Sequence, residues 1–243
     1  MPGNTSKQRI NTCQLMKDGE SYNYAMLLTK YRWHTIVISH PKSGRSWLRV
    51  MFNHLGIRAA YAHHGMGAPE QWQRIPLTFL YRDPRDTVVS VYFHRTRRFR
   101  DYHGTLAEMI RDGKLGLERI CRFNANWLAR GPQVAAGFFP LRYEELRQDT
   151  VGTLGRFIGH FHIAVSDDSI AKTVKKFTFE KMNAREAADV HGDAYSGTLS
   201  AANLADPDSF KVRRGKVGGY LDYLDANDLA YCAEVMTRHG FTP

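Results

Sequence analysis

The stretch Ile38–Val50, "ISHPKSGRSWLRV", decides the fold class of this chain. Before its polar centre lies the run "TIVIS" (Thr35–Ser39), which is apolar and β-branched almost throughout, as is typical of a strand buried on both faces of a parallel sheet. After Gly44, apolar side chains recur at helical spacing as far as Leu55, and Gly56 is placed to end that helix. The stretch therefore predicts a strand, a tight polar loop and a helix.

The same alternation returns further along the chain. "LTFLYRD" (Leu77–Asp83) predicts a strand, and the helix predicted after it covers Asp86–Phe99, with Asp86 near its start. "GFFPLR" predicts a third strand, which leads into one helix around Glu144–Phe161. A last helix begins at Asp225 as its N-cap. Alternating strands and helices predict an α/β fold, a three-layer sandwich around a central, mainly parallel sheet.

One domain behind a short arm is the organisation that the composition favours. Residues 1–33 are polar and weakly patterned, which predicts an N-terminal arm, and residues 34–243 show no break that would divide them. Within this single domain, the segment 183–210 is rich in small and polar residues. We expect it to be one long loop that acts as a lid over a site.

Charge points to an anionic ligand. The chain carries 34 Lys and Arg residues against 24 Asp and Glu, a formal net charge of +10, and its 43% of hydrophobic residues suffices for a folded core. Such a surplus attracts nucleic acid, anionic lipid, acidic polysaccharide or a multiply charged nucleotide. The alternative that the surplus of positive charge serves only solubility stays open at this point.

Cysteine usage and hydropathy indicate a cytoplasmic protein. Cys13, Cys121 and Cys232 lie far apart, without a neighbouring cysteine or a histidine at ligand spacing. This argues against a disulfide framework and against a metal site, and it fits a reducing compartment. The N-terminus lacks the apolar core of a secretion signal, and no run approaches the roughly 18 apolar residues of a transmembrane segment.

The loop after "TIVIS" contains the parts of a phosphate cradle. A turn between a parallel strand and a helix exposes unpaired backbone N–H groups beside the positive end of the helix dipole. Gly44 permits close approach, Ser43 and Ser46 offer hydroxyls, and Lys42 adds a positive charge. The pattern is not a Walker A motif, because the lysine precedes the glycine. Taken alone, the loop fits an ordinary turn as well as an anion site.

A second strand end repeats the arrangement. In "YRDPRDTVVSVYFH", Arg82 ends the predicted strand, and Ser90 lies two turns into the following helix. The two side chains can meet a second phosphate from two directions. By itself this stretch fits equally a solvated arginine beside Asp83 and Asp86.

Four motifs together resemble one enzyme family. "PKSGRSW", "RDPRDTVVSVYFH", "LRYEEL" and "VRRGKVGGY" occur in the order found in sulfotransferases that use 3′-phosphoadenosine 5′-phosphosulfate (PAPS), and the resemblance runs from about Thr35 to Tyr220. It implies a P-loop-nucleotide-hydrolase-like sandwich and an enzyme that moves a sulfuryl group from PAPS to a hydroxyl or amine, leaving 3′-phosphoadenosine 5′-phosphate (PAP). In-line transfer of this kind depends on positioning and charge stabilisation.

The resemblance assigns nucleotide contacts residue by residue. The 5′-phosphosulfate loop matches Lys42, Ser43, Gly44, Arg45, Ser46 and Trp47. The 3′-phosphate is implied to be gripped by Arg82 and Ser90 and closed over by Arg213, Arg214 and Gly215. Tyr143 and Phe179 match aromatic residues beside the adenine.

The chain also departs from the family pattern around these contacts. Arg45 stands where better-known members have a threonine, Arg214 replaces a lysine, and Phe177 replaces a threonine that contacts the nucleotide. "GGY" follows where Gly-Asp-Trp is usual. We therefore expect the base contacts to be less well conserved in this chain than the phosphate contacts.

Catalytic roles follow from the same resemblance. Lys42 is implied to stabilise the leaving phosphate, and Ser90 to hold Lys42 back until the acceptor binds. His63 in "YAHHGM" matches the general base by position, with His64 as its rival. Tyr61 replaces a second lysine of that segment, for which Arg45 or Arg49 are conceivable substitutes. His94, His103, His160 and His162 are assigned ordinary surface or core roles.

The acceptor is a small molecule or a saccharide on this interpretation. The interval between "PKSGRSW" and "RDPRD" is short, which suggests an open site, and the basic run "FHRTRRFR" (Phe93–Arg100) suggests a positive approach surface for an anionic acceptor. No feature indicates specific nucleic-acid recognition, no dimer motif stands out, and no residue cluster requires a metal. Two other functions remain as alternatives: a nucleotide or sugar kinase of related layout, and a non-enzymatic module that binds polyanions.

Overall fold

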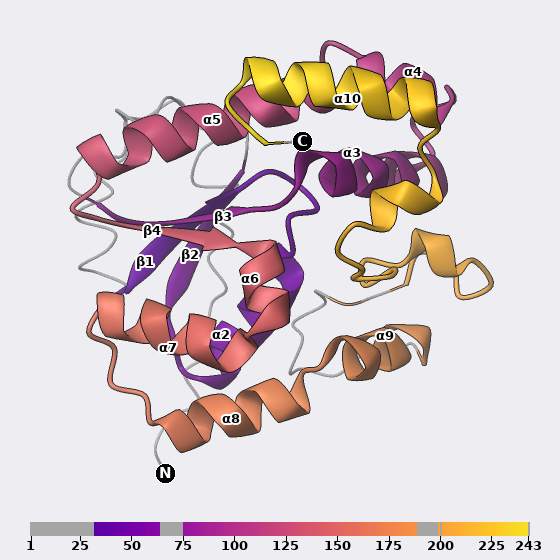
Figure 1. The fold of residues 1–243 in the computed structure, drawn as a ribbon. Coiled ribbons are helices and arrows are strands. Elements are labelled where there is room, and N and C mark those ends of the chain that lie inside the picture. The colour runs from indigo at the N-terminus through magenta and orange to yellow at the C-terminus, as the bar shows by residue number, and fades with distance from the viewer. Residues whose placement is uncertain (1–31, 64–74, 189–198, 200, 243) are drawn as a thin grey trace, which may run out of the picture.

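A four-stranded parallel sheet forms the centre of the molecule (Figure 1). The computed structural model describes residues 32–63, 75–188, 199 and 201–242. In the sheet the strands follow the order β2-β1-β3-β4, and their bounds are Thr35–Ser39 for β1, Ala59–His63 for β2, Pro76–Tyr81 for β3 and Gly137–Arg142 for β4. The expected α/β sandwich with a parallel sheet is confirmed.

The registers bring the carboxyl ends of three strands to one edge of the sheet. Ser39 at the end of β1 pairs with His63 at the end of β2 and with Leu80 near the end of β3. The loops that follow β1 and β3 therefore leave the sheet side by side. In open parallel sheets this edge is where ligands bind.

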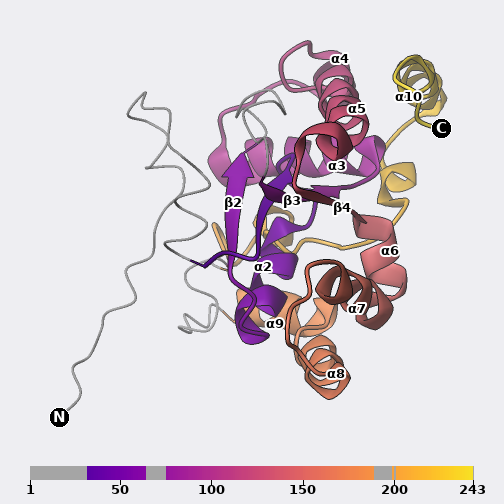
Figure 2. The same cartoon turned by 90° about the vertical axis from the view of Figure 1, so that its left-hand side faces the viewer.

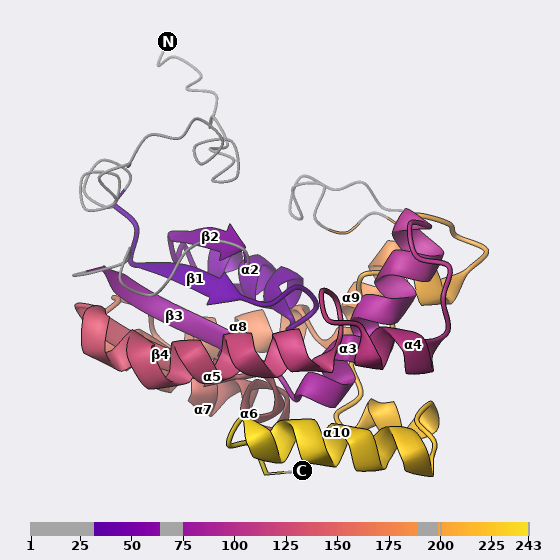
Figure 3. The same cartoon turned by 90° about the horizontal axis from the view of Figure 1, so that it is seen from above.

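Helices cover both faces of the sheet. Below it in Figure 1 lie α2 (Arg45–His54), α6 (Tyr143–Gln148), α7 (Thr150–His160), α8 (Asp167–Lys176) and α9 (Phe179–Ala187). Above it lie α3 (Pro84–Phe93), α4 (Leu106–Arg111), α5 (Leu117–Val134) and α10 (Ala226–Arg238). Figure 2 shows the same separation from the side, and Figure 3 shows α10 running alongside α5.

The layers pack through apolar side chains that alternate along the strands. Val37 faces α2 and α7 together with Phe52 and Phe157, whereas Ile36 and Phe79 face Trp127 of α5 on the other side. A third apolar cluster joins α3, α4, α5 and α10. Burial of these side chains provides the main stabilisation of the fold. Among the described residues, no helix is both long and apolar enough to cross a membrane.

Several boundaries differ from those expected. The strands at Thr35–Ser39 and Pro76–Tyr81 match the prediction, but β2 was not predicted, because "AAYAH" lacks the β-branched residues that mark a strand. The helix expected over Asp86–Phe99 is α3 followed by a π-helix, η2 (His94–Phe99). Its N-cap is Asp83, whose side chain accepts a hydrogen bond from the backbone N–H of Arg85 at 2.8 Å.

Two further expectations are corrected by helix termini. The single helix expected over Glu144–Phe161 is two helices, α6 and α7, because Asp149 caps the second by accepting from the backbone N–H of Gly152 at 2.8 Å. The segment 183–210 is not one loop, since α9 extends through Ala187 and a 3₁₀ turn, η4, spans Pro207–Ser209. Most of the proposed arm, residues 1–31, and residues 189–198 lie outside the described part of the chain.

Candidate active site

The loop after β1 has the backbone of an anion cradle. Lys42 has φ +70° and Gly44 has φ +97°, so both residues adopt left-handed conformations. Gly44 is the N-cap of α2 and brings no side chain to that position, and no described side chain caps the helix start. Successive turns of this kind point backbone N–H groups into one concavity, and the helix dipole adds positive charge there. A positive φ at a lysine is costly, which is typical of a functional loop.

Gly44 is also required by its neighbour Tyr143. A Cβ atom at position 44 would lie 2.5 Å from Cδ2 of Tyr143, closer than any relaxed contact. We expect Gly44→Ala to lower the free energy of unfolding by about 3 kcal/mol, the sum of left-handed strain and overpacking. Thermal unfolding monitored by circular dichroism measures the change.

Gly56→Ala is the matched control for this substitution. Gly56 has a similar φ of +69°, but a Cβ atom there meets nothing within 4 Å. In Gly56→Ala the free energy of unfolding should fall only by the cost of backbone strain, about 1 kcal/mol. Equal losses in the two variants would contradict the role assigned to the contact between the loop and Tyr143.

A cavity of about 410 Å³ opens at the carboxyl edge of the sheet, in front of this loop. It collects side chains from distant parts of the chain: the loop and α2, the stretch from Arg82 to His94, helices α6 and α9, and the segment 211–223. The residues that the sequence proposed and that line it are Lys42, Gly44, Arg45, Ser46, Trp47, Arg82, Ser90, Tyr143, Phe179, Arg213, Arg214 and Gly215.

Of the proposed site residues, Ser43 does not line the cavity, and His63 is described only in its backbone. Ser43 is buried, with 1% of its surface exposed, and its Oγ atom has no hydrogen-bond partner among the described residues. His63 ends β2 with its backbone beside Ser39. The side chain of His63 and the whole of His64 lie outside the described residues, so the base stays a prediction.

Lys42 is the central cation of the cavity. Within the described part of the chain its ammonium group makes no ion pair or hydrogen bond. Burial lowers the pKa of Lys42 to about 7; the carboxylate of Glu186 opposes this shift, whereas the positive charges of Arg98, Arg213 and Lys211 add to it. A lysine held this close to neutrality gains its charge when an anion arrives.

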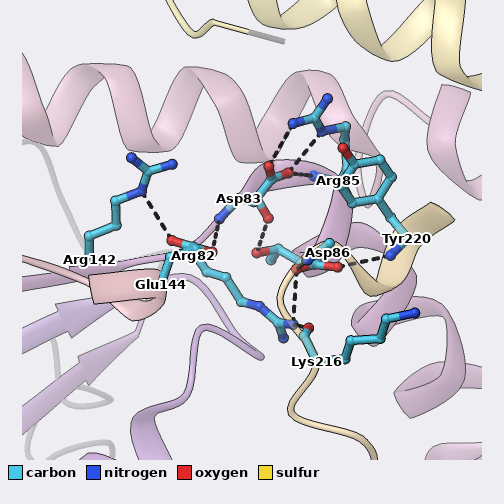
Figure 4. A network of polar contacts seen from close by, with 10 residues as sticks. Arg82, Asp83, Arg85, Asp86, Arg142, Glu144, Lys216 and Tyr220 are labelled. Atoms are coloured by element: carbon cyan, nitrogen blue, oxygen red, sulfur yellow. Dashed lines mark hydrogen bonds and ion pairs between the residues drawn. The ribbon is translucent and has the colours of Figure 1, made fainter. Parts of the chain in front are cut away.

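Arg82 belongs to a buried network that ties β3 to the C-terminal segment (Figure 4). Its Nη2 atom lies 3.2 Å from Oδ2 of Asp86 and donates to the carbonyl of Lys216 at 2.8 Å. Asp86, 3% exposed, also accepts from the backbone N–H groups of Gly218 and Tyr220, each at 3.0 Å. The sequence pattern predicted Asp86 only as a residue near the start of a helix.

The late arginines are held by carboxylates and aromatic rings. Arg213 donates to the Tyr223 hydroxyl at 2.6 Å, lies 3.3 Å from Asp208, and covers the Phe93 ring at 4.1 Å. Arg214 lies 3.4 Å from Asp222. These contacts orient both guanidinium groups before any ligand is present, which lowers the entropy lost on binding.

The segment turns at Gly215, where a side chain would meet Phe179. Gly215 has φ +59°, and a Cβ atom added there would collide with the Phe179 ring. This close approach places the late segment directly against α9. The glycine of the "RRGK" stretch is therefore needed for the shape of the cavity wall.

Aromatic side chains line part of the cavity beside the first turn of α2. The rings of Trp47 and Tyr143 meet edge to face at 6.2 Å, and the Trp47 indole donates to the carbonyl of Phe177 at 2.7 Å. Phe177 itself is 2% exposed and packs in the core, so its side chain has a structural role. Arg147, which the sequence analysis did not single out, lies about equally far from the rings of Trp47 and Phe179, at 5.5 and 5.4 Å.

His94 lines the cavity instead of the ordinary surface or core position expected for it. Burial, and then the charges of Lys42, Arg98, Lys211 and Arg95, lower its pKa to about 3. Its Nδ1 atom is buried without a hydrogen-bond partner among the described residues. Its spacing of four residues from Ser90 was the signal that placed the two on one helical face.

Comparison with known proteins decides the family. A family model described as "Sulfotransferase domain" matches residues 74–239. The chain belongs to the sulfotransferase family. The matched range contains Arg82, Ser90 and the late arginines of this sulfotransferase but begins after the loop at Lys42. The kinase and polyanion-module alternatives are set aside by this match.

Solved structures show the same fold in this sulfotransferase and its relatives. Mouse sulfotransferase SULT7A1, crystallised with PAP, is 16% identical with a TM-score of 0.62, over 89% of this chain and 90% of its own. Retinol dehydratase, crystallised with androsterone and the inactive cofactor PAP, is 15% identical with a TM-score of 0.60, over 85% and 80%. No curated protein matches the chain in a sequence comparison.

Proposed function

We propose that this sulfotransferase moves a sulfuryl group from PAPS to a hydroxyl or amine of an acceptor and releases PAP. The observation that carries the proposal is the convergence of Lys42, Arg82 and Arg213, from three distant segments, on one cavity. PAPS, when bound, supplies the activated sulfuryl group. Both solved relatives named above were crystallised with PAP, which supports the same nucleotide here.

The lining of the cavity fits a polyanionic nucleotide with an aromatic base. Eight Lys and Arg side chains line its described part against one carboxylate, that of Asp86. Trp47, Tyr143 and Phe179 offer ring faces and edges at one end. PAP carries roughly four negative charges in two clusters, and each charge-assisted hydrogen bond to such groups contributes about 1.5–3 kcal/mol.

Each part of the loop has a role in this proposal. The backbone N–H groups at the start of α2 and the hydroxyl of Ser46 hold the 5′-phosphate, while Lys42 stabilises negative charge that develops on the leaving oxygen. Ser43 contributes its backbone, since its side chain is buried away from the cavity. Ser90 lines the cavity with Lys42 and is proposed to hold the lysine back until the acceptor binds.

The general base is proposed to be His63, with His64 as the alternative. The backbone of His63 lies beside Ser39, directly before the loop that leads to Lys42. We assign the role of the missing second lysine to Arg45, because its Nη1 atom donates to the carbonyl of Ala62 at 3.0 Å and so reaches the strand that ends in His63. His63→Gln and His64→Gln variants identify the base by which of them loses kcat.

The acceptor is proposed to be a small molecule or a saccharide. Structures of retinol dehydratase contain androsterone or retinol, so acceptor-sized molecules fit this fold. The cytoplasmic location expected from cysteine usage also stays a prediction.

Titration calorimetry with PAP on the wild-type protein tests the proposal, with 5′-AMP, ATP and heparin as comparison ligands. We expect PAP to bind more tightly than the other ligands. 5′-AMP, for example, lacks the 3′-phosphate that is proposed to bind Arg82, Arg213 and Arg214. Labelled PAPS then serves to screen acceptors. Tighter binding of ATP or heparin than of PAP would contradict the proposal and favour the kinase or the polyanion module.

PAP binding is expected to take up a proton at pH 7.5. With a pKa of about 7, Lys42 is largely neutral in the free protein at that pH. The phosphates of PAP favour the charged form, so the pKa rises on binding and affinity falls as the pH is raised above about 7. Binding heats in MOPS and Tris buffers, which differ in ionisation enthalpy, measure the uptake. Uptake that persists in Lys42→Met would contradict this source of the proton.

A further inference from the structure

Beyond Lys42, the cavity contains cations that match no nucleotide contact. Arg49 lies one helical turn after Arg45 on α2, and Lys211 lies just after η4; both line the cavity. The guanidinium of Arg49 covers the Tyr61 ring of the edge strand β2 at 4.1 Å. Because β2 and β3 flank β1 on opposite sides, Arg49 lies on one side of the loop and Arg82 on the other.

The arginines on the two sides of the loop differ in whether a carboxylate pairs with them. Arg82 and Arg213 contact Asp86 and Asp208. Among the described residues Arg49 forms no ion pair, and its Nε atom, like that of Arg82, is buried without a hydrogen-bond partner. A buried guanidinium without a carboxylate partner is costly, so Arg49 gains from an anion brought by a ligand.

Further positive charge surrounds the same region. Lys211 has its pKa lowered by burial and then by the charge of Arg98, with Arg49 adding to the effect and Glu186 opposing it. Glu186 is fully buried, accepts from the backbone N–H groups of Lys211 and Val212 at 2.7 and 2.9 Å, and lies 3.8 Å from Arg98. Its one negative charge offsets only part of this group of cations. His94, kept neutral by its low pKa, adds no further positive charge.

We propose that the acceptor carries an anionic group, a carboxylate or a phosphate ester, that binds Arg49 and Lys211 beside the accepting hydroxyl or amine. Arginine binds both groups through paired N–H donors, and lysine adds a mobile charge. The proposal rests on the sulfotransferase function, because it places the acceptor on the far side of Lys42 from the nucleotide. It narrows the acceptor from any small molecule or saccharide to an acidic one.

Calorimetry on the PAP-saturated protein tests this inference with two probes of equal shape, 4-hydroxybenzoate and its neutral counterpart 4-hydroxybenzamide. Saturation with PAP occupies the phosphate sites, so only the acceptor region remains for the probes. We expect the carboxylate to bind at least about tenfold tighter than the amide. Arg49→Gln and Lys211→Gln should each reduce this ratio to threefold or less. Arg122→Gln, an exposed residue of α5, removes the same charge elsewhere and should leave the ratio unchanged.

The outcomes separate the two proposals. Failure of PAP to bind the wild-type protein would overturn the proposed function, and the acceptor inference with it. If PAP binds while the two probes bind equally, or neither binds, the acceptor inference alone is wrong. A preference for the carboxylate that survives in both variants would also overturn the assignment to Arg49 and Lys211. Retained PAP affinity in the variants shows that they are folded.

Discussion

Replacing Lys42 with methionine is expected to lower kcat for sulfuryl transfer by two to three orders of magnitude. The loss follows from removing a preorganised cation that faces the charge developing on the leaving phosphate, and contributions of this kind have about that size. The affinity for PAP should fall much less, because the backbone N–H groups and the arginines remain. Steady-state kinetics with PAPS and any acceptor found by screening measure kcat.

Stability distinguishes a catalytic loss from an unfolded protein. Burial disfavours the charged form of Lys42, as its lowered pKa shows, so a neutral side chain of similar length should leave the melting temperature equal or higher. Lys114→Met, at an exposed position, is the matched control and should retain full activity. A kcat within about threefold of wild type for Lys42→Met would remove this lysine from the mechanism.

Replacing Arg82 with alanine is expected to weaken PAP binding by at least about 100-fold. The variant loses a charge-assisted contact to phosphate, and it leaves the buried carboxylate of Asp86 without its ion pair, next to the place where phosphate binds. The melting temperature should fall as well. Calorimetric titration with PAP and thermal unfolding measure the two effects, and Arg142→Ala, half exposed at the end of β4, is the control.

A double variant separates binding from folding. In Arg82→Ala/Asp86→Ala the unpaired carboxylate of Asp86 is also removed, so part of the stability lost in Arg82→Ala should return. PAP affinity should stay low, since no cation has been restored. Recovery of wild-type affinity in the double variant would show that Arg82 acts only by neutralising Asp86.

Local sequence patterns were sufficient for the loop and the strands beside it. A run of β-branched residues predicts a buried strand, and a glycine predicts a left-handed turn. The strand Thr35–Ser39 and the turn at Gly44 could therefore be predicted from a few neighbouring residues. The N-cap at Asp225 was predictable for the same reason, and its side chain accepts from the backbone N–H of Asp228 at 2.8 Å. Each of these features depends on neighbours within a few residues.

Features set by distant contacts were missed. The partners of Asp86 at Gly218 and Tyr220 lie 132 and 134 residues away, so no local sequence pattern could predict these hydrogen bonds. His94 was assigned an ordinary role because the cavity that it lines is closed by the distant segment 211–223, although its spacing from Ser90 placed both on one helical face. Phe177 was noted only as a departure from the family pattern, and its place in the hydrophobic core was not predicted.

The bonds between Asp86 and the segment near Tyr220 also bear on how the protein is made. During translation the sheet strands, the last of which ends at Arg142, leave the ribosomal exit tunnel long before this segment does. Until it emerges, the carboxylate of Asp86 lacks its two backbone donors, and the cavity lacks the wall formed by Arg213 to Lys216. A nascent chain thus forms its sheet first, and nucleotide binding becomes possible only after the segment near Tyr220 has emerged.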